Sequence, residues 1–165
     1  MSHAVVLPLK NVARAEVHPV LTILRAYQQS RSRMTRRVLR VVHRAVQLAH
    51  ACDIPLQCAS LGGGLLLPHR GIGVVIHPDT VMGINCCVFH HCTLGTNGDG
   101  KAPRLGDCVE VGPGATILGG IHVGDYAQIG AGAIVTRDVP AYSLVTGANQ
   151  VRPNLKRFPQ RIAKL

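Results

Sequence analysis

A period of six residues in the middle of the chain constrains the fold more than any other feature. From Leu105 onward the sequence divides into LGDCVE, VGPGAT, ILGGIH, VGDYAQ, IGAGAI and VTRDVP. An aliphatic residue opens each unit, and a small or branched residue follows four places later. The opening residues are Leu105, Val111, Ile117, Val123, Ile129 and Val135. The period predicts a mainly β fold, a parallel β-helix in which three units form one triangular coil and coils stack about 4.8 Å apart. It leaves the handedness of the coil open.

The same period continues upstream in other phases, and the register is interrupted twice. Units led by Ile76, Met82, Val88 and Leu94 precede the regular array, and Leu61 and Leu67 lead earlier ones. The second interruption, GTNGDGKAPR before Leu105, is rich in Gly, Asn and Asp and is typical of an exposed loop. The first, between Leu67 and Ile76, contains His69. Because functional residues often lie where a regular scaffold is interrupted, His69 is a candidate active-site residue.

The composition fits a β-helix with a core of small side chains. The chain has 18 glycines and 10 prolines, but aromatic residues make up only 3%. Its six cysteines show no C-x-x-C pair or zinc-type spacing, so free thiols are expected rather than disulfides. Cys86 and Cys92 fall on the small inward positions, where a thiol packs as a compact apolar group, whereas Cys87 and Cys108 do not.

Charge divides the chain into three segments. Residues 1–52 carry nine Lys and Arg against one Glu, residues 53–147 carry four against seven acidic residues, and residues 148–165 carry five against none. We expect a basic N-terminal helical segment, a β-helix domain and a basic C-terminal tail. No apolar run is long enough to predict a membrane span. The first residues lack the pattern of a secretory signal, so a cytoplasmic location is expected.

The segment from about His18 to Ala51 is expected to be helical. One apolar stripe recurs at steps of three and four residues, while the arginines fall largely elsewhere. The stripe consists of Val38, Leu39, Val42, Ala45, Val46 and Ala49. In one interpretation the helix covers the open end of the β-helix and its basic face is solvated. In another, the arginines attract an anionic membrane surface or a lipid-linked glycan. Nucleic acid is disfavoured, because aromatics are few and no binding motif is present.

Three stretches together resemble the serine O-acetyltransferase family of hexapeptide-repeat acyltransferases. They are LPHRGIGVVIHPDTVMGINCCVFHHCTLG, APRLGD and VGPGATILGGIHVGDYAQIGAGAIVTRDVP. More narrowly, they are similar to short relatives from capsule and exopolysaccharide pathways. The resemblance covers residues 53–147. It implies a left-handed parallel β-helix, a homotrimer that can pair into a dimer of trimers, and acetyl-CoA as co-substrate, with no metal.

The sequence departs from serine acetyltransferases at the positions that bind serine. Pro68 replaces the aspartate before the catalytic histidine, and Lys101 and Ala102 stand where the family has an Arg-His pair. Most of the family's N-terminal helical domain, with its acceptor-contacting aspartate, is missing. The expected function is therefore acetyl transfer to a hydroxyl of a sugar or polysaccharide precursor. The alternative is serine O-acetylation in cysteine biosynthesis.

The resemblance also implies roles for individual residues. His69 would be the general base; the alternative is a structural turn histidine. Asp53 would orient His69, although it aligns with the family only after a one-residue slip; the alternative is a simple cap or turn residue. His90, His91 and Lys101 are expected to contact the acceptor; the alternative for the two histidines is that they are surface imidazoles. The residues expected at the acetyl-CoA site are Thr96, Pro113, Gly114 and Ala131 beside the pantetheine arm and Arg137, Arg152 and Lys156 near the phosphates.

Two other classes share the hexapeptide scaffold. Gamma-type carbonic anhydrases bind a metal through three histidines, two of them in a His-x4-His pair. The histidines at 77, 90, 91 and 122 offer no such pair, so this class is disfavoured. A non-catalytic scaffold would have no need of His69 or of the extended loop.

Overall fold

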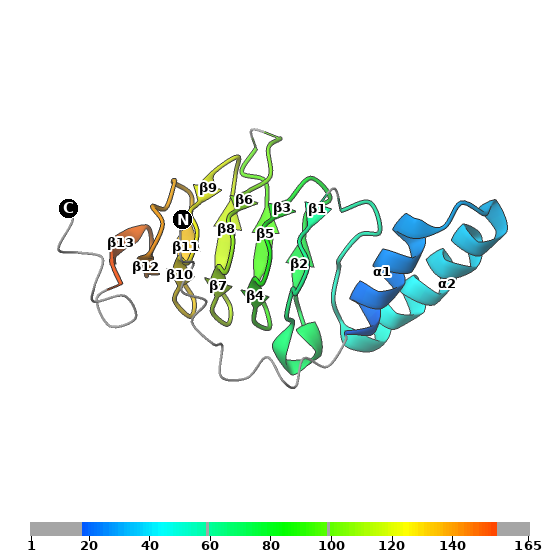
Figure 1. Ribbon diagram of the computed structural model, residues 1–165. Coiled ribbons are helices and arrows are strands. Elements are labelled where there is room, and N and C mark those ends of the chain that lie inside the picture. The colour runs from blue at the N-terminus through cyan, green and yellow to red at the C-terminus, as the bar shows by residue number, and fades with distance from the viewer. Residues whose placement is uncertain (1–17, 59, 99, 155–165) are drawn as a thin grey trace.

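The computed structural model describes residues 18–58, 60–98 and 100–154. Within them the chain is mainly β, with a pair of helices at one end of a stack of short strands (Figure 1). The helices are α1 (Pro19–Gln29) and α2 (Arg33–His50), and a short 3-10 turn, η2 (Pro68–Gly71), interrupts the first coil. None of the described helices is long and apolar enough to cross a membrane.

The strands are only two to four residues long, as expected when each side of a coil is one short segment. Their bounds are β1 (Ser60–Leu61), β2 (Val75–Ile76), β3 (Val81–Met82), β4 (Cys87–Val88), β5 (Thr93–Gly95), β6 (Arg104–Leu105), β7 (Glu110–Val111), β8 (Thr116–Leu118), β9 (His122–Val123), β10 (Gln128–Ile129), β11 (Ile134–Val135), β12 (Ser143–Thr146) and β13 (Gln150–Pro153).

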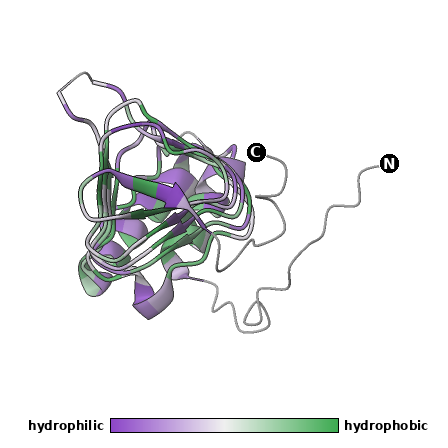
Figure 2. Ribbon diagram, turned by 90° about the vertical axis from the view of Figure 1, so that its left-hand side faces the viewer, coloured by the Kyte–Doolittle hydropathy of each residue, from purple (hydrophilic) through white to green (hydrophobic). Residues whose placement is uncertain are grey.

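The strands form three sheets, which are the three sides of the coil seen end-on in Figure 2. The strand orders are β1-β3-β6-β9, β13-β12-β10-β7-β4 and β11-β8-β5-β2. All strand pairs are parallel except β12 with β13. Gln128 pairs with Glu110, eighteen residues earlier, so three six-residue units make one coil.

Both interruptions predicted from the sequence are insertions between paired strands. Arg104 pairs with Val81, 23 residues earlier, because the loop between β5 and β6 adds residues to the coil. Val81 pairs with Ser60, 21 residues earlier, because η2 lengthens the first coil. The loop between β5 and β6 projects from the stack (Figures 1 and 2).

The predicted inward columns form the core. The aliphatic residues that open the units from Leu105 onward are at most 3% exposed. Burying such a side chain contributes about 1.5–3 kcal/mol each, so the columns dominate the stability of the stack. Cys86 and Cys92 are fully buried in the same columns, as predicted, and burial raises the pKa of the Cys86 thiol to about 11. All six cysteines are free.

The N-terminal region is two helices rather than one. α1 ends at Gln29, and Ser32 caps α2 by accepting a hydrogen bond from the Thr35 amide (3.3 Å). The serines at 30 and 32 are better caps than helix-interior residues, which explains the break. Helix α1 covers the first coil, where Val20, Leu21 and Leu24 join the core.

The predicted apolar stripe of α2 is largely wrong. Val38 and Val42 are 55% and 43% exposed, and only Leu39 and Val46 are half-buried. The buried face of α2 is instead made by His43 and Gln47. Gln47 donates hydrogen bonds to the carbonyl of Ile54 (3.1 Å) and to Asp53 Oδ1 (3.3 Å). Hydrogen bonding rather than apolar packing joins this helix to the first coil, so its hydrophobic periodicity is a poor guide.

Part of the expected basic tail continues the β-helix. Strand β13 folds back and pairs with β12, with Arg152 opposite Leu144. The antiparallel strand covers the last edge of its sheet, which an all-parallel stack would leave open.

Candidate active site

His69 lies in a strained turn between two sheets. In η2 both His69 (φ 56°, ψ 36°) and Arg70 (φ 60°, ψ 22°) adopt the left-handed conformation. This conformation costs roughly 1–2 kcal/mol per residue other than glycine, so the surrounding structure must hold the turn in place. The side chain of His69 is exposed, which leaves its ring accessible to a substrate. An observed outlier of this kind is a reason to look for function.

His18 fixes this turn to helix α1. Its Nε2 lies 2.7 Å from the carbonyl oxygen of Arg70, and its Nδ1 accepts a hydrogen bond from the amide of Val20 (3.3 Å). The ring therefore needs a proton on Nε2 and a lone pair on Nδ1, which is the neutral tautomer. Burial lowers the pKa of His18 and favours that neutral form. His18 was not predicted as a site residue, since a single histidine before a proline carries no recognisable pattern.

The His69 ring packs against a second histidine. The ring centroids of His69 and His90 are 4.9 Å apart at 87°, and those of His90 and His91 are 5.4 Å apart. Phe89 lies 6.4 Å from His69. Nδ1 of His90 is buried and has no hydrogen-bond partner among the described residues. A buried unpaired nitrogen is costly, so a polar group bound beside it would be stabilised.

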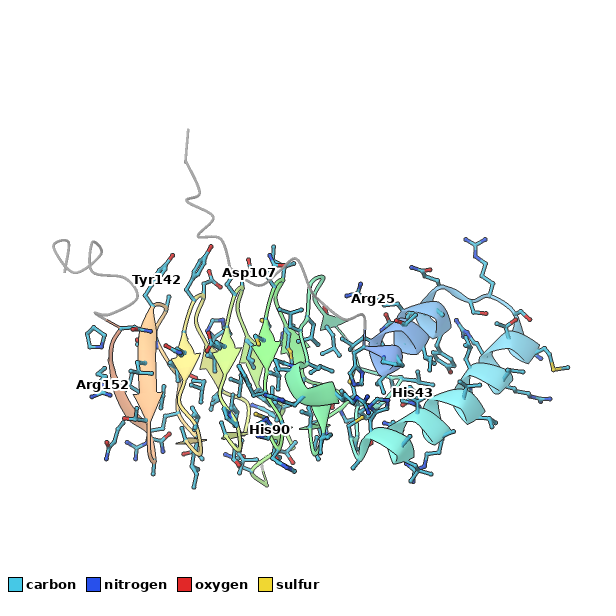
Figure 3. The ribbon with its side chains drawn as sticks, turned by 90° about the horizontal axis from the view of Figure 1, so that it is seen from below. Arg25, His43, His90, Asp107, Tyr142 and Arg152 are labelled. Atoms are coloured by element: carbon cyan, nitrogen blue, oxygen red, sulfur yellow. The ribbon has the colours of Figure 1, made fainter. Side chains whose placement is uncertain are left out.

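The turns stacked beneath His69 form one edge of the prism, which we call the histidine corner: His69, His90, His91, Pro113, Gly114, Ala131 and Gly132. The Gly114 amide donates to the His90 carbonyl (3.0 Å), and the Gly132 amide donates to the Pro113 carbonyl (2.8 Å). No atom lies within 4 Å of where a Cβ would stand on Gly114 or Gly132. The structure thus brings Pro113, Gly114 and Ala131 into one column with the histidines. Figure 3 shows His90 on this part of the stack.

The other predicted ligand-binding residues lie elsewhere. Thr96, Lys101 and Arg137 belong to the segments that follow β5 and β11, on the opposite edge of the β11-β8-β5-β2 sheet; we call this the loop corner. A Cβ on Gly120 would lie 2.7 Å from Lys101 Cβ, so the absent side chain leaves room for the loop. Arg152 is exposed on β13, and Lys156 lies outside the described residues. Within one chain, therefore, the predicted residues divide between two edges.

Asp53 lies at the first coil but has a different partner from the one expected. Its Oδ1 accepts a hydrogen bond from Gln47, and its backbone pairs with Val75, shortly after the His69 turn. No hydrogen bond between Asp53 and His69 is found among the described residues. Asp53 is exposed, whereas its neighbour His43 is buried, and desolvation lowers the pKa of His43 (Figure 3). An orienting role for Asp53 would require its side chain to exchange Gln47 for the imidazole.

Over residues 18–58, 60–98 and 100–154 no group of three or more His, Cys, Asp or Glu side chains is arranged to hold a metal ion.

The repeats and the sheets define the class: a hexapeptide-repeat β-helix. Residues 102–137 match the family described as "Bacterial transferase hexapeptide (six repeats)". Solved structures with the same architecture include a serine acetyltransferase from Brucella abortus (TM-score 0.68, 28% identity) and the soybean serine acetyltransferase apoenzyme (TM-score 0.66, 36% identity). Each match covers 81% of this chain, with 54% and 53% of the respective solved chains. The repeats and these neighbours imply a left-handed coil.

Similarity in sequence points the same way. A serine acetyltransferase of Helicobacter pylori is 45% identical over 93 residues, which are 54% of this chain and 54% of that protein. The chain thus spans about half the length of this relative. A probable serine acetyltransferase of rice is 47% identical over 94 residues, covering 54% of this chain and 30% of that protein. These relatives do not support the expectation of a closer likeness to capsule and exopolysaccharide enzymes.

Proposed function

We propose that this protein is an acetyl-CoA-dependent O-acetyltransferase in which His69 is the general base. One observation carries the proposal: in a domain 45% identical to a serine acetyltransferase, the interruption of the first coil presents an exposed imidazole beside an unpaired buried nitrogen of His90. The relatives favour serine as the acceptor. This reverses the order expected from the sequence, in which a sugar hydroxyl came first.

The proposed reaction needs one imidazole and no covalent enzyme intermediate. His69 removes the proton from the acceptor hydroxyl as its oxygen attacks the thioester carbonyl. The tetrahedral intermediate collapses, the bond between carbon and sulfur breaks, and His69 returns the proton to the CoA thiolate. Donors directed at the oxyanion would stabilise the intermediate. His90 is placed to contact the acceptor or the oxyanion, because its ring lies against His69.

A homotrimer would complete the site. On the outer face of the β11-β8-β5-β2 sheet, between the two corners, Val75 and Ile134 are 41% and 48% exposed and stand in one row with Thr93 and Thr116. Packing this face against a neighbouring copy would bring the histidine corner of one protomer close to the loop corner of the next. Acetyl-CoA would then lie between protomers, with Gly114 and Ala131 on one side and Thr96 and Arg137 on the other.

A sugar hydroxyl is the second candidate acceptor. Pro68 and the Lys101–Ala102 pair stand where the family's serine-binding residues are expected. A site that lacks partners for an amino group and a carboxylate loses the hydrogen bonds that select an amino acid. These departures are the specific reason to test glycans beside serine.

The test is acceptor-dependent release of CoA thiol from acetyl-CoA, followed by mass analysis of the product. Serine, a panel of nucleotide sugars and oligosaccharides are compared at equal concentration. Formation of O-acetylserine supports the favoured acceptor, and an acetylated sugar supports the second. Absence of release with every acceptor would contradict the proposed activity.

A further inference from the structure

Helix α2 exposes an apolar face that points away from the rest of the molecule. Met34, Val38, Val41, Ala45 and Leu48 are spaced by four, three, four and three residues, which places them on one face of a helix. Met34, Val41 and Leu48 are 69%, 72% and 71% exposed. The buried residues of α2, His43 and Gln47, lie on the opposite side. The face therefore has no partner among the described residues.

Helix α2 carries five arginines, and four of them run along one flank of that face. Arg33, Arg36, Arg37, Arg40 and Arg44 are all exposed. At 3.6 residues per turn, Arg33, Arg37, Arg40 and Arg44 fall between the exposed apolar face and the buried face, whereas Arg36 falls on the side of His43 and Gln47. Arg36 donates to the carbonyl of Ser30 (2.8 Å), and Arg40 donates to the Tyr27 hydroxyl (3.1 Å from Nη2). Both therefore hold the helical hairpin as well as contributing charge.

These arginines outnumber the acidic side chain beside them, since Asp53 lines a pocket with Arg40 and Arg44. Residues 18–52 contain no Asp or Glu, and no ion pair involves an α2 arginine in the described part of the chain. Clustered like charges next to exposed apolar side chains are unfavourable in a free surface helix. The same arrangement is favourable at the boundary between anionic headgroups and acyl chains, where the headgroups neutralise the charges and the acyl chains cover the apolar side chains.

We propose that the exposed face of α2 docks on an anionic lipid surface. Its apolar side chains enter the acyl boundary, while the arginine flank contacts the headgroup phosphates. A helix of 18 residues presents this face over about 27 Å, at 1.5 Å per residue. The docking is peripheral, because α2 lies in the plane of the interface rather than across it. This inference concerns location and is independent of acetyl transfer.

Charge argues against a second copy as the occupant. Two α2 helices packed antiparallel through this face would set the arginine flanks against each other, and no carboxylate in residues 18–52 would offset them. A parallel pair would still concentrate all of the arginines on one short bundle. An anionic bilayer supplies the opposite charge over the whole length of the helix.

The experiment is co-sedimentation of the full chain with vesicles of phosphatidylglycerol and phosphatidylcholine, compared with phosphatidylcholine alone. We expect binding only to the anionic vesicles, and weaker binding at high salt, where screening shortens the range of the charges. The triple variant Arg33→Gln, Arg37→Gln, Arg44→Gln spares the two arginines that brace the hairpin. At about fivefold per arginine, it should bind roughly a hundredfold more weakly.

A second variant tests the apolar half of the face. Val41→Ser with Leu48→Ser changes only highly exposed side chains, so folding should be unaffected while vesicle binding is lost. Ile84→Ser and Arg104→Gln, both exposed on the β-helix, are the matched controls and should bind normally. Equal binding by all variants, or no binding to anionic vesicles, overturns the proposal. So does a fall in the solution mass of the Val41→Ser, Leu48→Ser variant, since a second copy would then be the occupant.

Discussion

His18 and His69 are linked through a single backbone carbonyl, that of Arg70. The neutral ring of His18 bonds this oxygen from α1, and the turn it holds carries His69 in a left-handed conformation. The link is long-range in sequence, 52 residues, and short in space. The geometry of the proposed base thus depends on a helix outside the β-helix.

Replacing His18 with asparagine separates its two roles, which are to cap helix α1 and to position the turn that carries His69. Asparagine is a good N-cap, so α1 should still form, but its shorter side chain does not reach the Arg70 carbonyl. We expect kcat to fall about tenfold or more while KM for acetyl-CoA changes little, because the turn is misplaced rather than the cofactor site. Steady-state kinetics and circular dichroism measure the two effects. A parallel loss of helix and activity would mean that His18 is only structural.

The stability of the fold should fall as the pH drops below about 6.5, the ordinary pKa of histidine. Burial lowers the pKa values of His18 and His43 in the folded state. The unfolded chain therefore binds more protons in this range, and the free energy of unfolding decreases with falling pH. Urea unfolding at pH 7.5 and pH 5.5 measures the decrease, which His18→Asn should reduce. An identical decrease in the variant would assign the effect to other groups.

At the scale of elements, stacking of coils depends on the absence of side chains at particular turns. A Cβ on Gly62 would lie 2.0 Å from the carbonyl oxygen of Gly83 in the next coil, whereas a Cβ on Gly63 would meet nothing within 4 Å. Gly62→Ala should therefore destabilise the protein by roughly 1–3 kcal/mol, and the adjacent Gly63→Ala should have little effect. Thermal unfolding compares the two. Equal melting temperatures would show that the coils can separate without cost.

The six-residue period predicted the β-helix because every unit follows one rule. The first and fifth residues of each unit, such as Val111 and Ala115, point inward. It also located both interruptions, since a break in register is visible in the sequence. The helices were harder to predict. Hydrogen bonds from Gln47 determine which side of α2 packs against the first coil, and a hydrophobic pattern does not predict such bonds. His18 was missed for a similar reason: its partner Arg70 is distant in sequence.

The division of predicted ligand-binding residues between two corners likewise has a physical reason. A period of six predicts which residues lie in the same column of one chain. It does not predict which columns of different protomers would lie side by side in a trimer. Gly114 and Ala131 lie in the column of His90, whereas Thr96 and Arg137 lie across a sheet.

For the whole molecule, we predict that Ile134→Arg prevents trimer formation. Ile134 is exposed on the outer face of the β11-β8-β5-β2 sheet, between the corners, and an unpaired charge buried there by a neighbouring copy would be strongly unfavourable. Light scattering should report monomers, with loss of acetyl transfer. Ile84→Arg, on a different side of the coil, is the control and should assemble normally. A trimeric Ile134→Arg variant would exclude this face as the interface.

The central claim is that His69 is the general base of acetyl transfer. The most direct measurement is acceptor-dependent thiol release from acetyl-CoA by His69→Ala, beside His122→Ala, which removes an exposed histidine from β9. The account predicts a loss of about a hundredfold or more in kcat for His69→Ala, as expected for removal of a general base, and normal activity for His122→Ala. Wild-type rates in a folded His69→Ala variant would contradict it.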